Sequence, residues 1–505
     1  MAERRPISFG SIGLELASSI AAVRARERQE IPFRICILGD FSGRESRGAL
    51  ETLDGRKPLP VDRDNIDEVL AKLKVRIRLD PVGDMLAVAF NCLDDFHPDN
   101  LFEQLECFQT LKTTRRKLDD PRAYNAALED LRLLAGGRKV ESTVQPLPRS
   151  KPASQQENLL DQIVGATPQP SASTDRSDME AFLETLVRPY LVPGEDAEHD
   201  QLQSALDAYI SEYMRLLLHH ATFQALESAW RCVDFLVSRV ETDETLEIYL
   251  LDVSKAELQQ DLAASDDLTR SSMYGLFVAD NTEKPWSVLT GNYTFDYSDA
   301  ELLGRLSLIM HAAGAVFIAG SHAHLIGCED LAKTPDPRSW HQAPDADEAA
   351  TWDTLRRQPQ TASIGLVLPR FLLRLPYGRD TDAIDRFDFE EMDAEPRHSD
   401  YLWGNGAFAC TYLLAQSFSR YGWEMQPGLI QNVEGLPLHV YNFQGEARLT
   451  PCAEVLLTEM AVEALSEKGI MALATLKNTD AACLVRLQSL ADPPTGLAGR
   501  WNRSS

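Results

Sequence analysis

A change of composition in the middle of the chain constrains its fold more than any other feature. Between residues 136 and 178, Ser, Pro, Gln and Thr dominate and hydrophobic periodicity is lost, which predicts a flexible linker. On either side, apolar runs alternate with helical patterns, as in α/β folds. We therefore expect two α/β domains, at residues 31–135 and 179–492, preceded by an arm (1–30) and followed by a disordered tail (493–505).

The smaller domain is expected to begin with strands and to end with helices. Phe33–Leu38 is a continuous apolar run that fits a buried strand, and residues 75–79 and 86–90 have strand patterns. Apolar residues at helical spacing follow Pro98 and again follow Asp120. These patterns predict a small α/β unit that ends in a helical hairpin, joined by the linker to a larger α/β domain. The fold class is thus α/β (α+β).

Composition excludes several functions and suggests a cytoplasmic protein. The formal net charge of -27 argues against nucleic-acid binding, which requires clustered Lys and Arg, and against anionic membranes. No apolar run approaches the ~20 residues that a membrane helix needs. Arg4 and Arg5 precede a mildly apolar stretch, but Glu15 interrupts it, so we expect no cleaved signal. The 8 cysteines form no CxxC pair, which favours reduced thiols.

Two histidines and a cysteine form the tightest metal-type cluster of the sequence. If His322 and His324 lie on a strand, both imidazoles share one face, and Cys328 beyond the turn adds a third ligand. No acidic partner for these residues is evident in the sequence. We therefore favour ordinary packing over a metal site and expect no cofactor.

Two glycine-rich segments resemble nucleotide-binding loops only loosely. Gly404–Ala409 fits a relaxed dinucleotide fingerprint but lacks a convincing strand before it, and residues 39–43 (GDFSG) lack the Lys-Ser/Thr of a Walker loop. Both segments are interpreted as structural turns. No hydrolase, metalloprotease or kinase motif is found in the sequence, so we predict no catalytic residues.

An apolar island interrupts the linker at Glu157–Val164. A short amphipathic turn cannot bury itself there, and such peptides commonly dock into the groove of a partner. The alternative is a chance hydrophobic cluster. The predicted partner-binding residues are Leu159, Leu160, Ile163 and Val164.

Several segments together resemble the two sheath subunits of the bacterial type VI secretion system. IPFRICILGDFSGR (31–44), VDRDNIDEVLAKL and FNCLDDFHPDNLF resemble the small subunit, the TssB/VipA family. HHATFQALESAWRCVDFLV, LPRFLLRLPYG, YLWGNGAFA and VEGLPLHVY resemble the large subunit, TssC/VipB. The resemblance covers roughly residues 31–134 and 155–490, which places both subunits in one chain.

The resemblance implies a structural protein rather than an enzyme. It implies a sheath subunit that surrounds an Hcp inner tube and contracts to drive effector delivery. The implied partners are other sheath protomers (copies of itself or conventional TssB/TssC), Hcp, baseplate components and the ClpV unfoldase. Residues 157–166 resemble the helix that ClpV recognises, and residues 6–14 are a candidate strand for linking protomers, the alternative being a disordered terminus.

One departure from the family pattern leaves a second function open. The resemblance to the large subunit stops soon after residue 490, where family members continue with a stretch that contributes linking strands. The alternative function is therefore a non-polymerising accessory that caps, templates or regulates a conventional sheath. A metal- or nucleotide-dependent enzyme is the third hypothesis.

Overall fold

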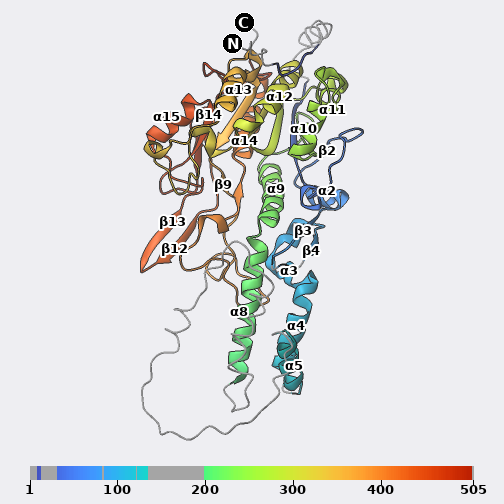
Figure 1. The fold of residues 1–505 in the computed structure, drawn as a ribbon, viewed down its shortest axis with the longest axis vertical. Helices are drawn as coiled ribbons and strands as arrows, with labels where there is room; N and C mark the ends of the chain where they lie inside the picture. Colours follow the sequence, from blue (N-terminus) through green and yellow to red (C-terminus); the bar gives the residue numbers. More distant parts are fainter. Residues whose placement is uncertain are drawn as a thin grey trace.

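The computed structural model describes residues 8–12, 31–134 apart from residues 82, 84 and 121, and 198–502. Within these ranges, a sheet covered by helices forms one end of the molecule, and long helices extend away from it (Figure 1). No helix of the described part is long and apolar enough to cross a membrane. The predicted linker lies outside the described residues.

The described residues contain a 9-stranded mixed sheet. Its strands are β1 (Phe33–Gly39), β2 (Leu59–Pro60), β5 (Leu246–Asp252), β6 (Val288–Phe295), β7 (Val316–Ser321), β8 (Ile364–Leu368), β11 (Asn432–Val433), β14 (Ile470–Thr475) and β15 (Ala482–Leu484). Their order is β11-β15-β14-β8-β7-β6-β1-β5-β2. The strands from β14 to β5 run parallel, whereas β15, β11 and β2 pair antiparallel at the two edges.

Strand β1 of the N-terminal segment lies inside the sheet formed by the larger segment. It pairs in parallel with β5 through Phe33 opposite Leu246, and with β6 through Ile35 opposite Val288. All residues of β1 are buried, and its side chains alternate between two hydrophobic cores, one on each face of the sheet. The two segments therefore share one sheet, an arrangement that the sequence did not predict.

Helices cover both faces of the sheet. On one face lie α9 (Ala221–Val237) and α14 (Gly406–Tyr421). On the other lie α10 (Lys255–Ala263), α11 (Ser272–Phe277), α12 (Ala300–Ala313), α13 (Ala346–Arg356) and α15 (Glu459–Glu467). Parallel sheets require cover on both faces because their strands are buried on both sides, as every residue of β1 and β7 is here.

The rest of the N-terminal segment forms a small α+β extension beside the long helix α8 (Glu198–Leu218) (Figure 1). Its elements are α2 (Ile66–Leu73), β3 (Arg76–Leu79), β4 (Leu86–Ala89), α3 (Pro98–Gln104), α4 (Glu106–Asp119) and α5 (Tyr124–Leu134). The predicted helical hairpin is confirmed as α4 and α5. The helix that begins at Pro98 ends earlier than its apolar pattern suggests, because Leu105 adopts an extended backbone (φ -78, ψ 132).

Two short antiparallel pairs complete the described fold. The first joins β9 (Phe371–Leu372) to β10 (Trp403–Gly404), and the second is the hairpin of β12 (His439–Phe443) and β13 (Glu446–Thr450). The hairpin projects from the side of the molecule (Figure 1).

The described part of the N-terminal arm lies against its own chain. Ser11 forms a parallel bridge with Asp267, and Phe9 is buried against Gly304 of α12. The rest of the candidate linking strand, residues 6–7 and 13–14, lies outside the described residues.

The C-terminal residues differ from the disordered tail expected from residue 493 onward. Leu497 and Trp501 are buried, and Trp501 stacks on Phe33 of β1. Arg500 donates hydrogen bonds to the carbonyls of Trp286 and Ala313. These contacts hold the segment through residue 502, because the apolar side chains of Leu497 and Trp501 are buried in the core.

Candidate assembly interface

The turn after β1 is held by groups from the larger segment. Asp252, the last residue of β5, accepts the backbone N–H groups of Phe41 (2.9 Å) and Ser42 (3.1 Å) with Oδ1. Trp230 of α9 donates its indole N–H to the Phe41 carbonyl at 2.9 Å. The amides of GDFSG that were considered for phosphate binding therefore already bind a carboxylate, which agrees with the predicted structural turn.

A buried ionic cluster joins the same turn to the start of α10. Arg44 donates to Glu257 through Nε (3.0 Å) and to the carbonyl of Asp252 (2.8 Å). Arg56 donates to both carboxylate oxygens of Glu257 at 2.8 Å. The Glu257 side chain is fully buried, so its ionised form needs these two guanidinium groups as counter-ions.

The electrostatics of Glu257 follow from this geometry. Burial acts to raise its pKa, but hydrogen bonds from Arg56 and from the Ser254 and Glu51 amides, together with the charge of Arg44, outweigh it and lower the pKa to about 2. Glu257 also closes a capping box with Ser254 at the start of α10. One carboxylate thus caps the start of a helix and pairs with two arginines from the other segment.

Aromatic contacts and an ion pair extend the interface along the helices. Phe223 of α9 packs against Phe90 and Phe96 of the N-terminal segment at centroid distances of 6.0 and 5.9 Å. Arg115 of α4 donates to Asp207 of α8 at 2.7 Å. The two segments are therefore joined both at the sheet and along the helical extension.

A second buried network lies within the larger segment. Arg374 donates to Glu227 of α9 (2.9 Å) and to Glu391 (2.7 Å). Burial acts to raise the pKa of Glu391, but the charge of Arg374 and hydrogen bonds from Arg374 and His219 lower it to about 2. This network ties the loop around Glu391 to the helix that also holds the turn after β1.

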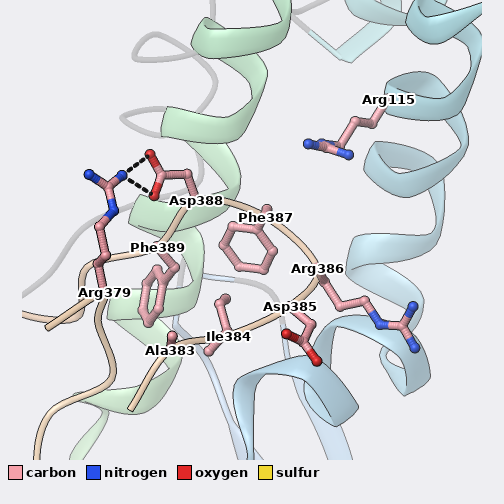
Figure 2. Close-up of a pocket in the computed structure, with 9 residues that line it drawn as sticks. All are labelled: Arg115, Arg379, Ala383, Ile384, Asp385, Arg386, Phe387, Asp388 and Phe389. Carbon is pink, nitrogen blue, oxygen red and sulfur yellow. Dashed lines mark hydrogen bonds and ion pairs between the residues drawn. The ribbon is translucent and has the colours of Figure 1, made fainter. Parts of the chain in front are cut away.

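A pocket of about 440 Å³ lies where this loop meets the helical extension (Figure 2). The lining residues are Arg115, Arg379, Ala383, Ile384, Asp385, Arg386, Phe387, Asp388 and Phe389. Phe387 and Phe389 are buried, whereas Arg379 and Asp388 are exposed and pair with each other at 3.0 Å. The lining contains no histidine, cysteine, serine or lysine, so it holds no Ser–His or Cys–His pair.

The structure does not bring together the three residues of the metal-type cluster, for which the sequence favoured ordinary packing. His322 lies just before the short turn Ala323–Ile326 and His324 lies within it, so neither is on a strand. Their ring centroids are 4.0 Å apart. Cys328 is buried with its sulfur 3.2 Å from the Thr334 hydroxyl. Asp296 lies beside the two histidines instead, with one possible ligand atom of each of the three residues within 4.8 Å of the other two. Burial, with a further contribution from His324, lowers the pKa of His322 below its usual value.

The glycine loop at residues 404–409 is a helix cap. The side chain of Asn405 accepts the N–H of Ala407 and donates to the Tyr293 carbonyl, both at 2.9 Å. The capping side chain thus binds the amide that a phosphate would use. The predicted partner-binding residues lie outside the described part of the chain; they are Leu159, Leu160, Ile163 and Val164.

Comparisons with known proteins agree with the two-segment organisation. Residues 15–134 match the family model of the type VI secretion system protein VipA, and residues 200–491 match that of the EvpB tail sheath N-terminal domain, VipB. The type VI secretion system sheath protein TssC1 of Pseudomonas aeruginosa is 34% identical over 346 residues, covering 64% of this chain and 69% of that protein. With both matches in one polypeptide and the interlocked sheet between them, the chain belongs to the type VI secretion sheath family, a structural and non-enzymatic family.

Proposed function

We propose that this chain is a structural subunit of a contractile sheath that surrounds an Hcp tube in the cytoplasm and contracts to drive effector delivery. The main support is strand β1: it lies between β5 and β6, so the small and large sheath segments form one folded unit. A chain of this kind supplies both segments in a fixed one-to-one ratio.

Polymerisation is tested by negative-stain electron microscopy of the purified chain, alone and mixed with conventional sheath subunits. Tubes formed by the chain alone are the expected result. Discrete particles that attach to tube ends or walls only when conventional subunits are present would instead identify an accessory that caps, templates or regulates a sheath. Particles that do neither would refute both functions.

We also propose that residues 6–14 link protomers by pairing with a sheet of a neighbour, a form of β-augmentation. Supporting this, the backbone of Ser11 already pairs in parallel, with Asp267 of its own chain. Deleting residues 1–12 should leave the folded unit intact and abolish tubes. Tubes of normal length from the deleted chain would contradict the linking role.

ClpV is the proposed recycling partner, through residues 157–166. The support is an apolar face of four residues in an otherwise polar stretch. Leu160→Glu should abolish capture by ClpV in a pull-down, because a charge in a groove of apolar contacts is not solvated. The matched control is Gln162→Glu, which adds the same charge beside that face; equal capture of both variants and the unmodified chain would remove this assignment.

A further inference from the structure

Three side chains with metal-binding chemistry converge at the carboxyl ends of two neighbouring strands. Asp296 directly follows β6, and His322 directly follows β7, while His324 lies in the turn after it. One possible ligand atom from each lies within 4.8 Å of the other two. The strands are adjacent and parallel, so their carboxyl ends meet at the same edge of the sheet.

The carboxylate of Asp296 has a free ligand position. Its Oδ1 accepts the backbone N–H of Ser298 (2.9 Å) and the hydroxyl of the same residue (2.6 Å). The side chain also faces the backbone N–H of Asp299 in a capping box, but among the described residues Oδ2 accepts no hydrogen bond of ordinary geometry and the carboxylate forms no ion pair. The Ser298 contacts orient the group, as hydrogen bonds to metal-ligating carboxylates commonly do.

Two nearby cations are already neutralised by other acids. Lys255 donates to Asp299 at 2.7 Å, and Arg370 donates to Glu454 at 3.1 Å. Neither contact uses the Asp296 carboxylate. The charge of Lys255 acts on Asp296 from a distance, but neither cation binds this carboxylate, so it stays open to a bound cation, and the two pairs limit the repulsion that such a cation would meet.

One hydrogen bond opposes ligation. Nδ1 of His322 accepts the backbone N–H of His324 at 3.2 Å. If Nδ1 binds the metal, its lone pair can no longer accept the His324 N–H. If Nε2 binds the metal, Nδ1 carries the proton of the neutral imidazole and cannot accept it either, so both modes displace this contact. A single long hydrogen bond is lost, whereas three coordinate bonds form.

We propose that Asp296, His322 and His324 bind one divalent transition-metal ion, which we assign as zinc. Two imidazoles and one carboxylate suit zinc, with a water in the fourth position. Tetrahedral ligand atoms lie about 3.3 Å apart at the usual Zn–N distance. The possible ligand atoms, which lie within 4.8 Å of one another, would therefore reach this spacing by rotation of the side chains. The ion would tie the end of β6 to the turn after β7, a structural role independent of the proposed polymerisation.

The test uses the full chain, stripped of metal by a chelator. Titration calorimetry with Zn²⁺ should give one site per chain, and Co²⁺ should give the intense visible absorption of tetrahedral coordination. Asp296→Asn and His322→Ala should each weaken binding by about 10-fold to 100-fold or more. Asn retains the cap that Asp296 provides, so this variant folds even if His322→Ala does not.

Cys328→Ser is the matched control, because its sulfur contacts Thr334 rather than the two histidines. It should bind zinc as tightly as the unmodified chain. Three results would overturn the proposal. They are the absence of saturable Zn²⁺ binding, a Co²⁺ spectrum of purely octahedral hydrated ion, and loss of binding in Cys328→Ser with Asp296→Asn unaffected.

Discussion

The substitution Glu257→Gln tests how the two segments are held together. Glu257 lies in the first turn of α10 in the larger segment, and it accepts hydrogen bonds from Arg44 and Arg56 of the N-terminal segment. Glutamine keeps the shape of the side chain but removes its charge, and it turns an N–H₂ group toward a guanidinium. The variant thus leaves positive charge buried without its counter-ion.

Two estimates of the folding free energy lost in Glu257→Gln agree. Removing one partner of a buried ion pair destabilises a protein by about 3–5 kcal/mol. The pKa of Glu257 falls from 4.5 to about 2, which corresponds to roughly 3 kcal/mol of stabilisation of the ionised form. Asp252 remains beside Arg44 in the variant, so we expect the lower value, about 3 kcal/mol.

The loss should depend on pH in a defined direction. The pKa of Glu257 is lower in the folded state than in the unfolded state, so its stabilisation is fully present above about pH 4.5 and declines as the pH falls toward 2. The difference in stability between Glu257→Gln and the unmodified chain should therefore fall by more than half, roughly, between pH 7 and pH 3.

The assay is urea unfolding followed by tryptophan fluorescence and circular dichroism at both pH values. Glu463→Gln is the control, because Glu463 is exposed on α15 and forms no ion pair within the described residues. Its effect should stay within about 0.5 kcal/mol. Equal effects of the two substitutions at pH 7, or a loss for Glu257→Gln that is the same at both pH values, would refute the electrostatic argument.

Two further predictions follow from the shared sheet and the docked arm. Residues 1–134 and 198–505, co-expressed as separate chains, should co-purify as a folded complex, whereas 198–505 expressed alone should be insoluble; a soluble, folded 198–505 fragment would contradict the central position of β1. Gly304→Ala should release the arm, because its Cβ would lie 2.3 Å from the ring of Phe9. Faster hydrogen exchange confined to residues 8–12 is the expected result, and unchanged exchange there would show that the ring simply moves aside.

Most secondary structure could be predicted because its signals are local. The apolar run at Phe33, the strand pattern at residues 75–79 and the helix that begins at Pro98 each depend on a few neighbouring residues, and each element is present. The tail was wrongly expected to be disordered from residue 493 because polar residues surround its apolar ones. Burial of Trp501 depends on a partner, Phe33, at the opposite end of the chain.

The candidate metal cluster likewise includes a residue that is distant in sequence and that local patterns could not identify. The sequence grouped His322 and His324 with Cys328, the nearest residue of suitable chemistry. Asp296 joins them in the fold because β6 and β7 are neighbours and end at the same edge. Spacing along the chain identifies ligands that share a turn, whereas a ligand from another strand becomes visible only when the order of strands is known.

The position of β1 also determines what the peptide connection between the two segments can add to their stability and assembly. Phe33 pairs with Leu246, so the strand and its neighbour are far apart in sequence, and seven buried residues are added to the centre of the sheet. At about 1.5–3 kcal/mol for each large apolar side chain, the burial of Phe33, Ile35, Ile37 and Leu38 is comparable to the total stability of a typical domain, about 5–15 kcal/mol. The segments would therefore stay together without a peptide connection. Joining them instead raises the effective concentration of one for the other, which favours rapid, one-to-one assembly over aggregation of an incomplete sheet.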